Sequence, residues 1–335
     1  MALLACASAL ACARAPVKAS GATQPSPVVW PEPPSPPRVR LAVVVSEGTN
    51  AAPARSWWRR AFGVITGEVA VDRPRTALER PFDVSVDETG AFAVADPDSR
   101  RVLRYDAKGN FAGDALCPGR EWSAPMGVVA MPGGELIVVD SGAASIVRWT
   151  LHGCRVVCET GLLRPVGVAA RGDRIVVADP PAHQVVALSG TGEVLGRWGQ
   201  RGDGPGQFQF PTDVALDADG SMFVVDSLNF RIAHLDRDGR WLGTFGDLGE
   251  QDGGLARPKG IDLDAAGLVY VTDAQRDVVV VTRRDGALEY LLGAPGAEPG
   301  RLAHPAGIAA SGSRVAIADS LNGRVQVFET VGARP

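Results

Sequence analysis

Six aspartates are the residues of this sequence whose spacing is regular enough for concerted chemistry. They recur every 39 to 47 residues, as Asp96, Asp140, Asp179, Asp226, Asp273 and Asp319. Gathered in a ring, such carboxylates could hold a cation, because hard cations prefer oxygen ligands. Each aspartate ends an apolar run, however, and a carboxylate placed there can accept backbone N–H groups of the turn that follows. We therefore predict that the six aspartates are structural.

Two further aspartates interrupt the repeating pattern and are better candidates for a unique site. Asp83 and Asp213 stand two residues after a proline, where the other repeats have glycine, preceded in one case by Lys259. At the rim of a channel these two carboxylates could hold a cation, or they could cap turns. Apart from such a channel cation, the sequence predicts no cofactor.

The aspartates belong to a repeat that must position them. A proline opens each repeat 14 or 15 residues before its aspartate, at Pro81, Pro125, Pro165, Pro211, Pro258 and Pro305. Between the two landmarks lie an alternating apolar run, a turn and a second apolar run, as in PTDVALDADGSMFVVD. Two more runs, such as RIAHLD and WLGTFG, complete the repeat. Alternation with period two predicts antiparallel strands, and four-stranded units of about 45 residues are propeller blades. The sequence therefore predicts an all-β, six-bladed β-propeller.

The last repeat lacks its fourth strand. The chain ends soon after RVQVFE, whereas the strand-like RVRLAVVVS at residues 38–46 precedes the first repeat. Pairing the two would remove an open sheet edge. We predict that residues 38–46 close the ring, that the propeller spans residues 38–335, and that residues 47–80 form an insertion on its top face.

The repeats resemble the NHL repeat. The matching features over about residues 81–330 are the P-x-[GD]-[VI] opening, the aspartate that ends the second strand, and the N-x-R-[IV] start of the third strand at 229–232 and 322–325. The resemblance implies the same six-bladed ring. In the fifth repeat, TDAQRDVVVV departs from this pattern, and we predict that it is one residue shorter there.

Binding residues are expected on the top face, where the loops before the first strands and after the second strands meet. The candidates are Trp57, Trp58, Asp83, Asp213, Asn229, Arg231, Lys259 and Asn322. The two tryptophans lie in SWWRRAFGVI, residues 56–65, which suits a short helix. They either pack on the rim of the propeller or anchor a partner, since exposed Trp is favoured in interface hot spots.

The N-terminal residues favour export. Residues 1–15 resemble a secretion signal, and both Cys6 and Cys12 end a stretch similar to a bacterial lipobox. The proline-rich residues 16–37 predict a stiff spacer without a core of its own. The sequence thus predicts an exported protein, periplasmic or anchored to the outer membrane by lipid.

Three cysteines lie within the predicted propeller. Cys154 and Cys158 would stand roughly 13 Å apart on a straight strand, too far for a disulfide. Cys117 could pair with either of them in an oxidising compartment. The sequence leaves that choice open.

The net charge and the spacing of the histidines and cysteines limit the classes of function that the sequence supports. A net charge of −4 offers no electrostatic basis for a nucleic-acid partner. None of the four histidines has metal-ligand spacing, and no C-x-x-C is present. We therefore expect a non-catalytic binding or assembly scaffold of the bacterial cell envelope, with envelope proteins as partners and an oligomeric state that the sequence does not define. The alternative is a metal-dependent lyase or hydrolase with its site at the top of the channel.

Overall fold

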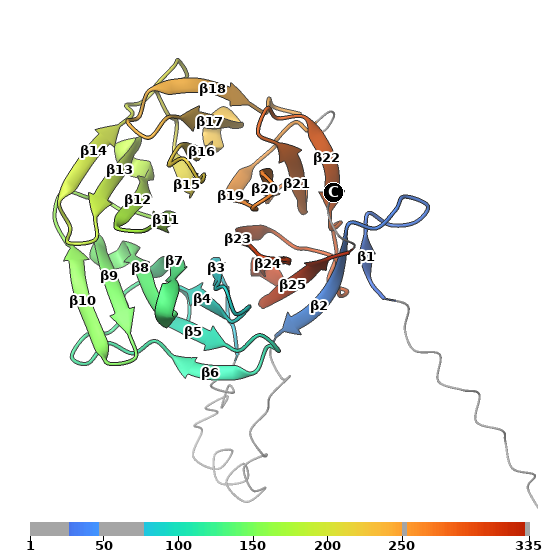
Figure 1. The fold of residues 1–335 in the computed structure, drawn as a ribbon, viewed down its shortest axis with the longest axis horizontal. Helices are drawn as coiled ribbons and strands as arrows, with labels where there is room; N and C mark the ends of the chain where they lie inside the picture. Colours follow the sequence, from blue (N-terminus) through green and yellow to red (C-terminus); the bar gives the residue numbers. More distant parts are fainter. Residues whose placement is uncertain (1–26, 47–76, 250–252, 332–335) are drawn as a thin grey trace, which may run out of the picture.

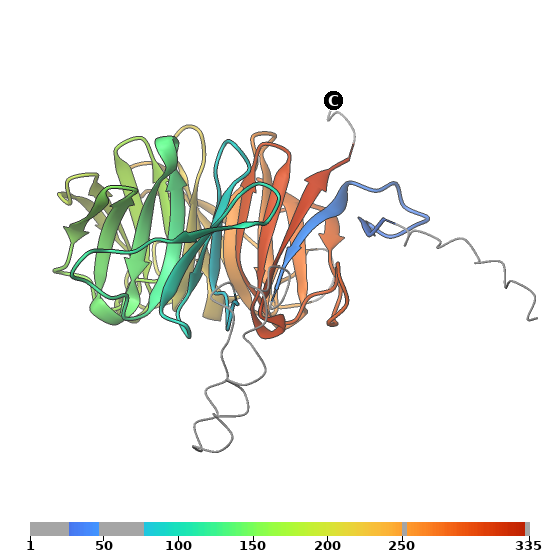
Figure 2. The same ribbon diagram turned by 90° about the horizontal axis from the view of Figure 1, so that it is seen from below.

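The alternating apolar runs form strands, and each repeat folds into one antiparallel sheet. The structure is a computed structural model that describes residues 27–46, 77–249 and 253–331. Within these ranges, six sheets stand around a central axis (Figure 1). Seen from the side, the ring is a disc with loops on its two faces (Figure 2). The predicted six-bladed β-propeller is confirmed.

The first three blades each use four consecutive strands. Blade 1 comprises β3 (Asp83–Val86), β4 (Phe92–Asp96), β5 (Arg101–Tyr105) and β6 (Phe111–Asp114). Blade 2 comprises β7 (Pro125–Met131), β8 (Glu135–Asp140), β9 (Ser145–Thr150) and β10 (Gly153–Cys158). Blade 3 comprises β11 (Val168–Arg171), β12 (Arg174–Asp179), β13 (Gln184–Ser189) and β14 (Val194–Trp198). The first strand of each blade lies nearest the axis (Figure 1).

The second half of the ring repeats this order until the last blade. Blade 4 comprises β15 (Pro211–Leu216), β16 (Met222–Asp226), β17 (Arg231–Leu235) and β18 (Trp241–Phe245). Blade 5 comprises β19 (Pro258–Leu263), β20 (Leu268–Asp273), β21 (Val278–Arg283) and β22 (Leu288–Leu292). Blade 6 comprises β23 (Pro305–Ser311), β24 (Arg314–Asp319), β25 (Arg324–Thr330), β2 (Val39–Val45) and β1 (Val29–Trp30). Short 3-10 turns are η1 (Pro132–Gly134), η2 (Ser141–Ala143), η3 (Pro180–Ala182), η4 (Ser227–Asn229) and η5 (Ser320–Asn322).

The ring closes through strands from the two ends of the chain. Strand β2 pairs antiparallel with β25, from Val39 opposite Thr330 to Val45 opposite Val325. The predicted closure by residues 38–46 is therefore confirmed. Strand β2 thus supplies the fourth strand of blade 6.

The folded body begins earlier than residue 38, so the predicted boundary of the spacer is wrong. Strand β1 pairs with β2 and adds a fifth strand to blade 6. Trp30 is buried in the cluster between blades 5 and 6, and Val28 packs against it. Burying an aromatic side chain removes a large apolar area from water, which explains why this proline-rich segment folds back onto the blade.

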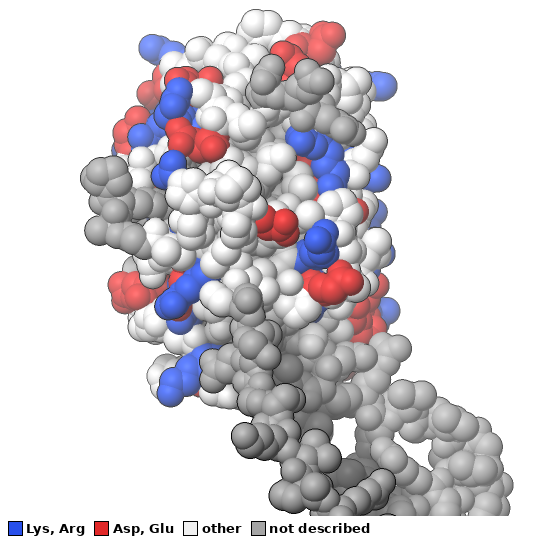
Figure 3. All heavy atoms as spheres, turned by 90° about the vertical axis from the view of Figure 1, so that its right-hand side faces the viewer, with Lys and Arg blue, Asp and Glu red and all other residues white. Residues whose placement is uncertain are grey.

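The hydrophobic core is divided into six clusters, each between two neighbouring blades. The faces of every sheet are covered by the sheets of the neighbouring blades rather than by a separate layer. Each blade therefore stabilises two neighbours, as repeat units generally do. On the outer wall seen in Figure 3, acidic and basic side chains are interspersed among uncharged ones.

A disulfide joins Cys117, in the link between blades 1 and 2, to Cys154 on β10, with a Cα–Cα distance of 5.4 Å. Of the two partners that the sequence left open, Cys154 is the one used, and Cys158 is free. The bond fixes the link against the outer edge of blade 2.

Several predicted features lie outside the described residues. They are the export signal, Cys6 and Cys12, residues 16–26 of the spacer, and the part of the insertion that contains Trp57 and Trp58. No helix in the described part of the chain is both long and apolar enough to cross a membrane.

The six repeating aspartates are almost completely buried, with at most 1% of their surface exposed. Each accepts backbone N–H groups from the loop before the first strand of its own blade, which we call the leading loop. The donors are Glu79 and Arg80, Ser123 and Ala124, Leu163 and Arg164, Gln209, Ala256 and Arg257, and Ala303. Donors in the turn that follows, which the sequence predicted, are added for Asp96 and Asp273. The aspartates are structural, but their principal partners lie about 16 residues upstream.

Removing the closing strands should weaken the whole ring. A chain that begins at residue 47 lacks β1 and β2, exposes the edge of β25 and leaves part of the last core cluster uncovered. We expect a lower and broader denaturant transition, because neighbouring blades stabilise one another. A chain that begins at residue 27 keeps both strands and should unfold like the full-length protein. Identical transitions for the two shortened chains would contradict closure by β2.

The buried aspartates can be tested in blade 4. Asp226→Ala removes the acceptor for Gln209 and the ionic partner of Arg231, 2.8 Å away. The free energy of unfolding should fall by about 3 kcal/mol, as when one member of a buried ion pair is deleted. Pro211→Ala, in the same loop region, should cost less than about 1 kcal/mol. Urea denaturation compares the two, and equal losses would show that Asp226 has no special role.

Candidate functional site

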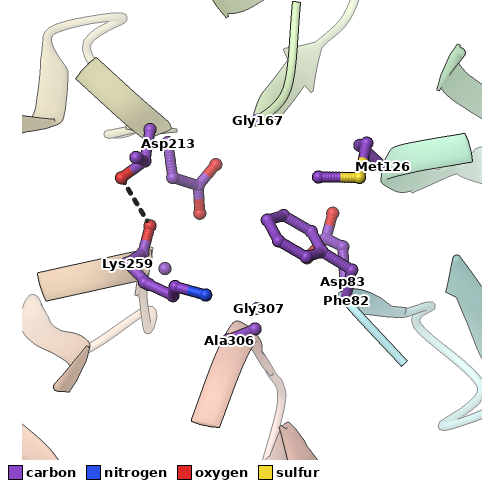
Figure 4. A pocket seen from close by; sticks show the side chains of 10 residues that line it. Phe82, Asp83, Met126, Gly167, Asp213, Lys259, Ala306 and Gly307 are labelled. Atoms are coloured by element: carbon purple, nitrogen blue, oxygen red, sulfur yellow. Dashed lines mark hydrogen bonds between the residues drawn. The ribbon is translucent and has the colours of Figure 1, made fainter. Parts of the chain in front are cut away.

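A cavity opens on the top face, which we define as the face carrying the leading loops and the turns after the second strands. It lies at the mouth of the central channel and has a volume of about 310 Å³, including space open to solvent. All six blades line it (Figure 4). The lining residues are Phe82, Asp83, Met126, Gly167, Thr212, Asp213, Lys259, Gly260, Ala306 and Gly307. Three of the predicted candidates, Asp83, Asp213 and Lys259, are therefore brought together.

The first strands approach one another so closely that glycine is required beside each aspartate. A Cβ on Gly307 would lie 2.1 Å from Oδ1 of Asp83, and a Cβ on Gly167 would lie 2.2 Å from Oδ1 of Asp213. No side chain fits at such distances. Around the ring the P-x-[GD] position runs Asp, Gly, Gly, Asp, Gly, Gly, and the glycine before each aspartate leaves the space that the carboxylate fills.

Asp83 and Asp213 bridge adjacent blades instead of capping turns. Asp83 accepts the N–H of Val84 at 2.9 Å and that of Val128, in the next blade, at 2.8 Å. Asp213 accepts the N–H of Val214 at 2.9 Å and that of Ile261, in the next blade, at 3.0 Å. Both oxygens of each carboxylate are therefore occupied, and one of the two joins neighbouring first strands.

A third bridging aspartate was missed by the sequence reasoning. Asp262 accepts the N–H of Leu263 at 2.8 Å and that of Ala310 in blade 6 at 2.8 Å. It stands two residues beyond the glycine position on its strand, and alternate strand residues point to the same side. The signal available in the sequence was a polar residue two positions after that glycine.

Burial makes these carboxylates unusually hard to ionise. Loss of hydration raises the pKa of Asp83 to about 7 and the pKa of Asp262 to about 6. The pKa of Asp213 is raised well above its usual range, first by burial and then by the charge of Asp83. The described residues contain no group of three or more His, Cys, Asp or Glu side chains arranged to hold a metal ion.

Lys259 reaches toward blade 1 across Ala306, whose small side chain is 1% exposed. Its ammonium nitrogen lies 5.3 Å from the centre of the Phe82 ring, a cation–π arrangement. Burial first, and then the positive charges of Arg257 and Arg80, lower the pKa of Lys259 to about 8. The mouth therefore combines an aromatic face with an amine that is partly stripped of water.

The remaining described candidates lie elsewhere on the top face and do not line the cavity. Asn229 donates to the carbonyl of Gly202, and Arg231 donates to the carbonyls of Asp203 and Gln207. Asn322 donates to the carbonyl of Gly296 in the equivalent loop of blade 6. Because backbone carbonyls in glycine-rich loops need donors, these side chains hold the leading loops in place.

The fifth repeat has the same spacing as the others, so the predicted one-residue shortening is wrong. Strand β21 starts at Val278, five residues after Asp273, just as β17 starts at Arg231, five residues after Asp226. Valine cannot donate to the leading loop, and Arg276 donates to the carbonyl of Gly254 instead. The fifth repeat therefore keeps the spacing of the others, and Arg276 supplies the side-chain donor to the leading loop from a different position.

No protein-family model matches the sequence. The fold is similar to that of virginiamycin B lyase from Staphylococcus aureus, with a TM-score of 0.56 and 12% identity, covering 76% of this chain and 96% of the lyase. A gluconolactonase from Xanthomonas campestris gives a TM-score of 0.56 and 17% identity, covering 76% of this chain and 88% of that one. A chain of the nidogen/laminin complex gives 0.54 and 17%, covering 72% and 86%.

These similarities show the fold alone: a six-bladed propeller related to those of the lyase and the gluconolactonase. The three proteins include enzymes and a member of a protein complex. Since one fold hosts many functions, the function of this chain has to be argued from its own cavity.

Asp83 provides a pH test of the site. A carboxyl group with a raised pKa stabilises the fold most below its unfolded value, near 4, and that contribution is lost as the pH rises through about 7. Between pH 5 and pH 8, wild type should therefore lose at least about 1 kcal/mol of stability relative to Asp83→Asn, since one pKa unit corresponds to about 1.4 kcal/mol.

Urea denaturation at both pH values measures this difference. Glu88→Gln, at an exposed turn on the opposite face, should follow wild type. If Asp83→Asn also follows wild type, Asp83 does not titrate in this range.

Proposed function

We propose that this chain is an exported, non-catalytic binding module of the bacterial cell envelope, built as an NHL-type propeller. Its ligand or partner binds at the mouth of the channel on the top face. The observation that carries the proposal is the convergence of Phe82, Met126, Thr212 and Lys259, from four different blades, on one open cavity. Such a mixture of apolar walls with a few polar groups is typical of binding sites.

The placement of the acidic and imidazole groups supports binding rather than catalysis. Both oxygens of Asp83 and of Asp213 already accept backbone N–H groups. His183 accepts the N–H of Phe210, and His234 stacks on Phe223 with ring centres 4.1 Å apart. No histidine is among the residues that line the cavity. A general base free to reach a bound substrate is thus not provided by these groups.

Export is supported by the disulfide between Cys117 and Cys154, because such bonds persist mainly in oxidising compartments. Together with the predicted signal and the two lipobox-like cysteines, it favours the periplasm or a lipid anchor on the outer membrane. Envelope proteins are then the expected partners.

A photo-crosslinker placed in the mouth tests the proposal. Met126 would be replaced by benzoylphenylalanine in the full-length protein, expressed in its own cells and irradiated. We expect a discrete crosslinked product in the envelope fraction. The control carries the same group at Glu88, on the opposite face, and should give none. Equal crosslinking from both positions, or none from Met126, would contradict a binding role for the mouth.

Elemental analysis of the purified protein addresses the alternative function. A metal-dependent lyase or hydrolase should retain zinc or calcium in a stoichiometric amount, and its metal content should fall in Asp213→Ala. A metal-free protein whose Met126 position crosslinks a partner supports the binding module.

A further inference from the structure

The amine of Lys259 has no acidic partner among the described residues. The neighbouring charges that act on it are those of Arg257 and Arg80, both positive. Its one aromatic contact, Phe82, attracts a cation only weakly compared with a carboxylate. A partly buried ammonium group surrounded by other cations is costly, and a bound anion would offset that cost.

The backbone of the two arginines near Lys259 is fixed in the leading loops. The backbone N–H of Arg257 is bound by Asp273 and that of Arg80 by Asp96. Both arginines are exposed. His304 completes the group: the charges that act on it include those of Lys259, Arg257 and Arg80, against the single acid Asp277. Lys259, Arg257 and Arg80 thus bring positive charge to the mouth over blades 5 and 1.

The other side of the cavity is apolar. Phe82 and Met126 line it from blades 1 and 2, with Phe82 beside the Lys259 amine and Met126 beyond it (Figure 4). Thr212 is not a free donor, because its hydroxyl donates to the carbonyl of Lys259 at 2.9 Å. A ligand therefore meets one concentrated positive charge beside an aromatic and a thioether surface.

Two carboxyl groups limit the charge that the site accepts. Asp83 and Asp213 also line the cavity, and a multiply charged anion would be repelled by whichever of them is ionised. A monoanion attached to an apolar group suits this arrangement better than a phosphate dianion does.

We propose that the mouth binds organic monocarboxylates, with the carboxylate beside Lys259 and an attached apolar group against Phe82 and Met126. The inference rests on the proposed function, since it names the ligand class of the same cavity. The carboxylate could belong to a small molecule or to the C-terminus of a peptide, and the two sources share this chemistry.

The small number of lysines allows a direct test. The sequence contains only Lys18, Lys108 and Lys259, so reductive methylation with a ¹³C label gives three lysine NMR signals besides that of a free α-amine, and the methylated amines keep their charge. Phenylacetate should shift the Lys259 signal saturably and leave that of Lys108 unchanged. The neutral phenylacetamide should shift neither, and inorganic phosphate should bind at least fivefold more weakly than phenylacetate.

Variants give a second measurement on unlabelled protein. Lys259→Met keeps the length of the side chain and should weaken phenylacetate binding at least tenfold, as followed by ligand-observed NMR. The matched control Lys108→Met, in an exposed turn, should bind like wild type. N-acetylphenylalanine that binds as tightly as phenylacetate assigns the natural carboxylate to a peptide terminus, whereas weaker binding assigns it to a small molecule.

Three results would overturn the inference: no saturable shift with phenylacetate, an equal shift with phenylacetamide, or unchanged affinity in Lys259→Met. These failures are separable from failure of the proposed function. If phenylacetate does not bind while the crosslinker at Met126 still captures a partner, the mouth is a binding site for another chemistry. If phenylacetate binds and no partner is captured, the carboxylate site is supported and the proposed role as an envelope scaffold is contradicted.

Discussion

The hydrogen bonds between a buried aspartate and the loop upstream of it are the interaction on which the rest of the structure depends. In each blade the carboxylate at the end of the second strand holds the loop that leads into the first strand. An unpaired buried carboxylate or N–H group would be costly, so the two segments cannot easily separate. In all six blades, the proline that follows this loop and the residue after that proline are thereby placed at the channel mouth.

The cavity at that mouth is a property of the closed ring and not of any one blade. Its lining comes from all six blades, and the apolar clusters that fix the blades lie between neighbours. Three further aspartates join first strands across blade boundaries. The side chains that could meet a ligand are therefore held in position by contacts that run around the whole circumference.

The repeat pattern predicted the blades, the closing strand and the part of the top face where Asp83, Asp213 and Lys259 meet, because period and spacing are local properties of a sequence. It did not reveal what those side chains contact. The partners of Asp83 and Asp262 lie 45 and 48 residues away, and no single repeat shows them. Strand β1 was missed because proline-rich composition describes the average of a segment, whereas burial of Trp30 is decided by one side chain.

The pairing of β2 with β25 also determines when the fold can be completed during synthesis. Residue 39 pairs with residue 330, so the partner of the first long strand is made only after all the strands of blades 1 to 5. Blades 1 to 5 can form from consecutive strands, while β2 can pair only with the short strand β1 until β25 exists. Contacts between such distant residues are slow to form. A chain cut short near its C-terminus would keep most of its blades and still present a long unpaired strand, which is the feature that promotes aggregation.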